Sequence, residues 1–114
     1  MSTANATKLT ELIVGNHTEG YNNTMLNEIQ LGSNDLLRKL DVTNCSILTN
    51  PLQLGNCSNI EEIYAAGTAI TSVELPSSGY LKVMHVPNTI KTLTITNHPN
   101  LTDDNLIIGS GREV

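Results

Sequence analysis

Apolar residues recur along this chain in triplets that share the spacing apolar-x-x-apolar-x-apolar. Clear copies begin at Leu37, Ile60 and Leu81, and from residue 26 onward successive copies begin nine to twelve residues apart. The last two positions of a triplet are two residues apart, so their side chains point to one face of a strand. The pattern therefore predicts short strands at regular intervals. The complete set of triplets is Leu9, Leu12 and Val14; Leu26, Ile29 and Leu31; Leu37, Leu40 and Val42; Thr49, Leu52 and Leu54; Ile60, Ile63 and Ala65; Ile70, Val73 and Leu75; Leu81, Met84 and Val86; Ile90, Leu93 and Ile95; and an imperfect ninth copy, Leu101, Leu106 and Ile108.

Two successive triplets make one coil of about 20–23 residues, and one coil cannot bury its apolar face alone. We see no amphipathic helical segment of ten residues, so the return segments are also expected to be strands. The pattern thus predicts an all-β solenoid of about four turns, with two parallel β ladders and little or no helix. We expect an N-terminal flank at 1–8, the solenoid at 9–108 with an irregular first turn at 9–36, and a C-terminal tail at 109–114. The side chains expected to be fully buried are Leu40, Leu54, Ile63 and Leu93.

The spacing also fits the leucine-rich-repeat pattern L-x-x-L-x-L-x-x-N/C-x-L. The segment that begins at Leu37 and continues through Cys45 to Ile47 fits it at every place, and the segment that begins at Ile60 departs at Ala65 and Thr68. Residues 37–108 resemble leucine-rich-repeat regions of phage and prophage tail or virion proteins, and similar regions in surface proteins of gut bacteria. The resemblance is carried by the stretches NIEEIYAAGTAITSVELP, LKVMHVPNTIKTLTI and NLTD.

The resemblance implies a non-enzymatic structural or recognition module of a phage or prophage tail or virion protein, in contact with a protein or a cell-surface glycan. The alternative is a leucine-rich-repeat adhesion or host-interaction module of a bacterial cell surface. The expected location is the virion in the first case. In the second it is extracellular or at the cell surface, through sequences outside this chain. The family motif encodes a fold rather than catalysis, so the resemblance assigns no functional residue.

The composition argues against nucleic acid and membranes as binding partners. The chain has 114 residues and a formal net charge of −5, so it lacks the basic footprint expected for nucleic-acid binding. No apolar run approaches the roughly 20 residues of a membrane-spanning helix, and we expect no membrane insertion. Asparagine and threonine occur 14 times each, which disfavours a helical bundle because both are poor helix formers.

Motifs for catalysis are absent from the sequence. His17, His85 and His98 fall in unrelated phases of the repeat, and no phosphate loop, nucleophile elbow or metal-binding motif is found. Asp103 and Asp104 are interpreted as polar residues of a corner or a helix start. We therefore expect no enzyme activity, no catalytic residue, no cofactor and no metal site.

The outward positions between paired triplet residues form the candidate binding surface. Neighbouring strands stand about 4.8 Å apart, so equivalent outward residues should form a continuous stripe. A mixture of apolar, aromatic and ionisable groups is typical of recognition surfaces, although these residues could equally be the solvated face of a sheet. The candidate stripe comprises Ile13, Asp41, Tyr64, His85 and Ile107. The opposite ladder should present the uniformly polar set Gln30, Gln53, Glu74 and Thr94.

Cys45 and Cys57 lie in near-copies of one segment, twelve residues apart. They follow strands in successive half-turns, so we expect them on different sides of the solenoid, as free buried thiols. Asparagine recurs two residues after the triplet, where its side chain can bind backbone amides at a corner. This recurrence also creates several N-x-S/T sequons, which we interpret as by-products of the turns. The corner asparagines are Asn16, Asn44, Asn56, Asn88 and Asn97.

The ends of such a stack pose a separate problem. A terminal coil exposes core side chains and an unpaired strand edge unless another segment covers them. Residues 106–108 are expected to form a nearly bare terminal strand, with only a six-residue tail after it. We therefore expect flanking domains in a longer chain, or end-to-end self-association of copies.

Overall fold

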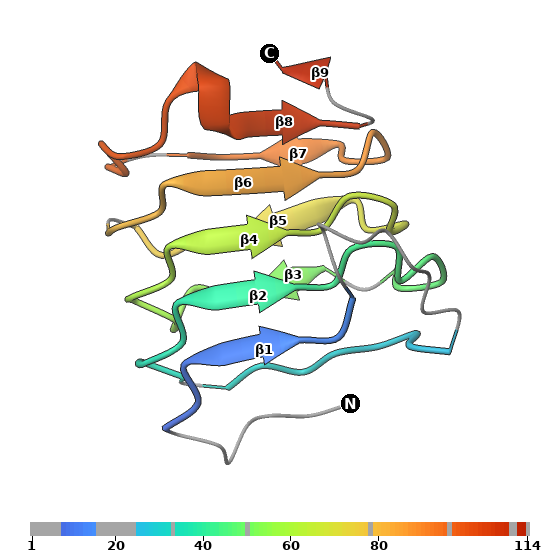
Figure 1. Cartoon of the computed structure of the whole chain (residues 1–114), viewed down its shortest axis with the longest axis horizontal. Coiled ribbons are helices and arrows are strands. Elements are labelled where there is room, and N and C mark those ends of the chain that lie inside the picture. Colours follow the sequence, from blue (N-terminus) through green and yellow to red (C-terminus); the bar gives the residue numbers. More distant parts are fainter. Residues whose placement is uncertain are drawn as a thin grey trace.

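The computed structural model describes residues 8–15, 25–32, 34–49, 51–77, 79–95, 97–109 and 112–113. Two sheets face one another across an aliphatic core (Figure 1). The six-stranded sheet contains, in spatial order, β1 (Glu11–Ile13), β2 (Lys39–Asp41), β4 (Glu62–Tyr64), β6 (Val83–Val86), β8 (Leu106–Ile108) and β9 (Arg112–Glu113). The three-stranded sheet contains β3 (Leu52–Gln53), β5 (Ser72–Glu74) and β7 (Thr92–Leu93). One short 3-10 helix, η1 (Asp103–Asn105), precedes β8.

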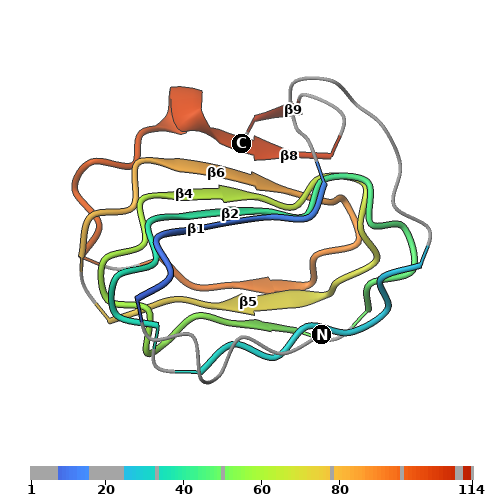
Figure 2. The same ribbon diagram turned by 60° about the horizontal axis from the view of Figure 1, so that its bottom comes forward.

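From β2 to β8 the chain alternates between the two sheets, and the successive strands within each sheet are parallel. Figure 2 shows the resulting coils lying one above another around a shared interior. The prediction of an all-β solenoid with two parallel ladders is confirmed. It has about three turns, close to the expected four. The irregular first segment supplies β1 but only an isolated bridge residue, Gln30, in its return half.

The core consists of the triplet side chains, as the spacing predicts. Leu40 and Ile63 are direct neighbours in register on β2 and β4, and both are fully buried, as is Leu54. The expectation of full burial is wrong for Leu93, which is only partly buried. Leu93 lies on β7, the last strand of its sheet, and within the described residues no further strand packs beyond it.

The fourth triplet begins one residue earlier than predicted. Leu48 is fully buried, whereas Thr49 is exposed and Ile47 is 45% exposed. Two consecutive tight turns cause this shift, with the Cys45 N–H donating to the Val42 carbonyl and the Leu48 N–H donating to the Cys45 carbonyl. The turns direct Leu48 inward. Ile47 therefore does not occupy the core place that the leucine-rich-repeat pattern gives it.

Part of the predicted C-terminal tail forms a strand of the six-stranded sheet. β9 pairs antiparallel with β8, with Ile107 opposite Glu113 and Ile108 opposite Arg112. Residues 106–108 are thus not the bare terminal strand that we expected, because the chain reverses at Gly109 and covers part of the edge. Gly109 has a φ of 78°, a conformation that L side chains rarely adopt.

Two of the predicted corner asparagines adopt a left-handed backbone conformation. Asn44 and Asn97 adopt positive φ angles of 61° and 58°. Gly67, at the place equivalent to Asn44 in the next coil, has a φ of 76°. The Asn97 side-chain amide donates to the Ser77 carbonyl of the preceding coil over 3.2 Å, rather than accepting from a backbone amide. Asn16 lies outside the described residues. Asn44 and Asn97 therefore tolerate the left-handed backbone, and Asn97 also links neighbouring coils.

Candidate functional site

The stripe forms in the order that the repeat predicts. Each of its five residues is the register partner of the next along the six-stranded sheet, from Ile13 on β1 to Ile107 on β8. The regular coil length brings together side chains that are separated by 21 to 28 residues in the sequence. The alignment of the stripe is therefore confirmed.

The stripe is less open to solvent than we expected. Asp41 is only 2% exposed and Tyr64 only 7%, whereas Ile13 is 49% exposed. The Asp41 carboxylate accepts the Thr43 backbone N–H at 3.0 Å, so part of its hydrogen-bonding capacity serves the turn that follows β2. His85 and Ile107 are partly buried. The accessible part of the stripe is thus confined to its two ends and His85.

Tyr64 is held by its neighbours on three sides. Its hydroxyl donates to Glu62 Oε1 at 2.5 Å, and its ring meets the His85 ring edge to face, with centroids 5.0 Å apart. The Lys39 ammonium lies 5.8 Å from the ring centroid, within cation–π range. Burial, together with the bond to Glu62 and its negative charge, raises the pKa of the Tyr64 hydroxyl. The hydroxyl therefore stays protonated and acts as a donor within the sheet.

A second outward column runs beside the stripe, and the sequence interpretation missed it. Lys39 and Glu62 are register partners two residues before Asp41 and Tyr64, and so face the same side of the sheet. At the strand entrances, Glu61 lies between Arg38 and Lys82, with N–O distances of 3.9 and 3.5 Å. The sequence signal that could have predicted this column is the alternation of basic and acidic residues at the spacing of the coils. Exposed ion pairs of this kind contribute about 0–1 kcal/mol each, so they add little to stability.

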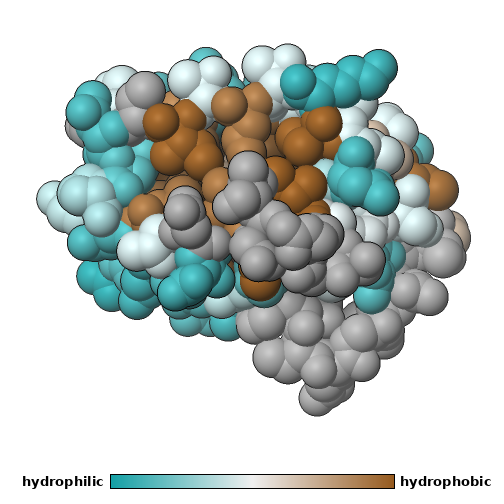
Figure 3. Space-filling model, turned by 90° about the horizontal axis from the view of Figure 1, so that it is seen from above, coloured by the Kyte–Doolittle hydropathy of each residue, from teal (hydrophilic) through white to brown (hydrophobic). Residues whose placement is uncertain are grey.

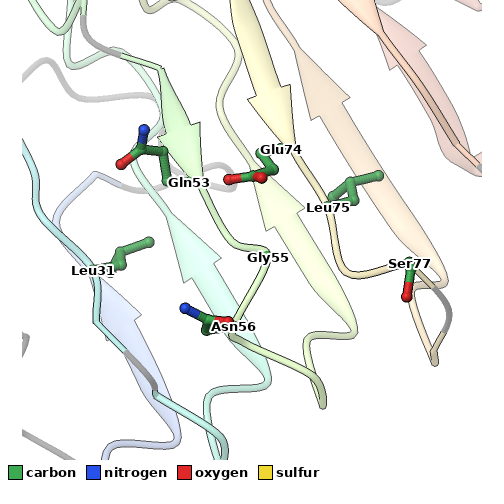
Figure 4. Close-up of a pocket in the computed structure, with 7 residues that line it drawn as sticks. All are labelled: Leu31, Gln53, Gly55, Asn56, Glu74, Leu75 and Ser77. Atoms are coloured by element: carbon green, nitrogen blue, oxygen red, sulfur yellow. The ribbon is translucent and has the colours of Figure 1, made fainter.

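The three-stranded sheet carries a different surface. Gln30, Gln53, Glu74 and Thr94 are all exposed, which confirms the prediction of a uniformly polar face. Beside two of them, where the chain leaves β3 and β5, lies a shallow hollow of about 470 Å³ (Figure 4). Its lining comprises Leu31, Gln53, Gly55, Asn56, Glu74, Leu75 and Ser77.

Gly55 lies in the lining of the hollow, close to the Glu74 side chain. A Cβ atom at Gly55 would lie 3.3 Å from the Glu74 Cδ atom, so the carboxylate of the next coil projects over the glycine backbone. Figure 4 shows the Gln53 and Glu74 side chains on adjacent strands, with their polar ends on the same side of the sheet. The sequence interpretation placed these two residues only in the uniformly polar set of the opposite ladder.

The histidines do not come together into a catalytic or metal site in the part of the chain that the structure describes. His85 packs on Tyr64, and His98 is buried in the corner after β7. His98 Nε2 lies 2.9 Å from the Pro76 carbonyl oxygen, which can only accept, so Nε2 carries the proton. The other ring nitrogen, Nδ1, has no hydrogen-bond partner among the described residues. His17 lies outside the described residues.

No group of three or more metal-ligating side chains gathers among the described residues. In the same ranges, no helix is long and apolar enough to cross a membrane.

Cys45 and Cys57 are both free and fully buried, and they follow strands of different sheets, as predicted. Burial raises the pKa of both thiols, and the nearby Asp41 carboxylate adds to the increase at Cys45. Because the thiolate is the reactive form, we expect both cysteines to react with iodoacetamide at least about tenfold more slowly in the native protein than in denaturant. Mass spectrometry of the quenched reaction measures the rates. Equal rates, or a mass two hydrogens lower before reduction, would contradict this assignment.

The C-terminal end of the stack carries an apolar surface. Figure 3 looks onto this end, where hydrophobic residues in brown gather at the centre with polar residues in teal to either side. Apart from Ile29, the triplet residues before Leu37 are only partly buried. Those from Leu37 to Val86 are mostly buried, and those of the C-terminal coils, from Ile90 onward, are again only partly buried. The partly buried residues of these coils are Ile90, Leu93, Ile95, Leu101, Leu106 and Ile108.

Comparison with known proteins finds no matching family model, no similar curated protein and no similar solved structure. The resemblance to leucine-rich repeats therefore rests on the triplet spacing and the quoted stretches alone.

Proposed function

We propose that this chain is a non-enzymatic structural and recognition module that makes protein–protein contacts through the end of its solenoid. The observation that carries the proposal is the apolar C-terminal end. Positions that are fully buried in inner coils, such as Leu40 and Ile63, have only partly buried counterparts at Leu93 and Leu106. An apolar end surface with polar surroundings is typical of a surface that another polypeptide covers.

The size of this end supports the proposal. The coils stack along the axis of 27 Å extent, so the end face spans the other two dimensions, 31 by 24 Å. A face of these dimensions is of the order of the roughly 800 Å² that each partner buries in a standard interface, although β9 covers part of it. The outer edge of β7 adds backbone groups that no described strand pairs. Another copy of this chain, or a flanking domain of a longer one, would cover both features.

Light scattering after size-exclusion chromatography tests association between copies. We expect the average mass to rise with concentration, and we expect Leu93→Lys to shift this rise to at least about tenfold higher concentration, because it places a charge on the apolar end. Thr94→Lys is the matched control, since it adds the same charge at the adjacent outward position. Circular dichroism of both variants confirms that they remain folded.

A monomer at every concentration would contradict association between copies and leave a flanking domain as the partner. An equal effect of the two lysine substitutions would mean that the apolar end is not the contact.

The proposed setting is a phage or prophage tail or virion. Support comes from the resemblance of residues 37–108 to repeat regions of such proteins. The neighbouring genes test the setting directly, because tail and capsid genes beside this one would support it. Genes for sorting and secretion would favour a bacterial surface instead.

A further inference from the structure

The polar hollow on the three-stranded sheet is built from three successive coils. Leu31 comes from the first, Gln53 and Asn56 from the second, and Glu74 and Ser77 from the third. Its volume of about 470 Å³ falls within the range of about 300–1,000 Å³ that small-ligand sites occupy. The hollow therefore has the size of a ligand site, and its groups are set by the stacking of coils rather than by one loop.

The polar side chains that line the hollow form no hydrogen bonds or ion pairs with other described residues. Among the described residues, no hydrogen bond or ion pair involves the side chain of Gln53, Asn56, Glu74 or Ser77. The stripe on the opposite sheet differs, because Tyr64 and Asp41 there bond to protein groups. The hollow is thus a place where hydrogen-bonding capacity remains for a ligand.

The chemistry of these groups restricts the ligand. Two carboxamides and a hydroxyl both donate and accept hydrogen bonds, and the Glu74 carboxylate only accepts. A bound anion would meet the negative charge of Glu74, and a bound metal cation would leave the amide donors of Gln53 and Asn56 unused. A neutral ligand with several hydroxyl groups matches both kinds of group. Adjacent hydroxyls can donate to the carboxylate while others accept from the amides.

We propose that this hollow binds a neutral saccharide, with Glu74, Gln53 and Asn56 as hydrogen-bonding residues and Leu31 and Leu75 against its apolar faces. The site lies on the side of the solenoid, so it does not rest on the end contacts proposed above. Because the hollow is open and has no aromatic platform in its lining, we expect weak binding to a single sugar unit.

Nuclear magnetic resonance titration of the ¹⁵N-labelled protein tests the proposal. The probes are glucose, galactose, mannose and N-acetylglucosamine, each added to tens of millimolar. We expect at least one of them to shift the backbone amide signals of Gly55, Asn56 and Ser77. Glu74→Ala should weaken that binding about tenfold, because it removes charge-assisted hydrogen bonds.

Thr94→Ala is the matched control, since Thr94 lies in the same outward column but outside the hollow, and it should leave the affinity unchanged. The absence of any shift at the hollow with all four sugars would overturn the proposal. So would shifts there with calcium or phosphate alone, or equal losses of affinity in the two variants.

Discussion

Replacing Leu40 by alanine should lower the free energy of unfolding by about 2–5 kcal/mol. Leu40 is fully buried at the centre of β2 and is flanked in register by Leu12 on β1 and Ile63 on β4. Truncation removes buried methyl groups and leaves a cavity between coils that the strand pairing prevents from closing. Urea denaturation followed by circular dichroism measures the loss.

Leu36→Ala provides the control for the Leu40 variant. Leu36 is 46% exposed, so its truncation should change stability by no more than about 0.5 kcal/mol. A loss below about 1 kcal/mol for Leu40→Ala would contradict the assigned phase of the core.

Gly67→Ala should cost about 1–3 kcal/mol. Gly67 has a φ of 76°, and a Cβ atom there would lie 2.1 Å from Asn44 Oδ1, in the corner of the neighbouring coil. The alanine variant must therefore adopt a strained backbone conformation and also displace Asn44, which itself has a positive φ. Thermal and urea unfolding should both detect the loss.

Gly55→Ala is the matched control for this glycine. The nearest atom to a Cβ at Gly55 is Glu74 Cδ at 3.3 Å, and that exposed side chain can move aside. We expect its cost to be clearly smaller than that of Gly67→Ala. Equal costs would mean that the corner at Gly67 is not constrained by its conformation and by Asn44.

The sequence by itself determined the repeating part of this protein. Alternation with a period of two assigns one face of each strand to the core, and nearly constant coil length fixes which strands pair. These two regularities are enough to place Leu40 beside Ile63 and to align Tyr64 with His85. They also separate Cys45 from Cys57, because the two residues follow strands of different sheets. Such features depend only on spacing along the chain.

The candidate sites were only partly predictable for the same reason. Spacing identifies the stripe and the polar face of the three-stranded sheet. It does not show which polar side chains form hydrogen bonds within the protein. Asp41 bonds to the Thr43 amide and Tyr64 to Glu62, whereas Gln53 and Glu74 project beside a hollow at Gly55. The surface with unused hydrogen-bonding groups thus lies on the three-stranded sheet, which the sequence analysis did not select as the candidate binding surface.

Only the tertiary structure determined the positions at which the protein deviates from the triplet pattern. Tight turns at Cys45 bring Leu48 rather than Thr49 into the core, and the absence of a described strand beyond β7 leaves Leu93 partly buried. The reversal at Gly109 adds β9 antiparallel to β8, although the tail carries no triplet. Burial at these positions depends on what the neighbouring coil supplies across the stack. That neighbour is about 20 residues away in sequence, so a local pattern cannot report it.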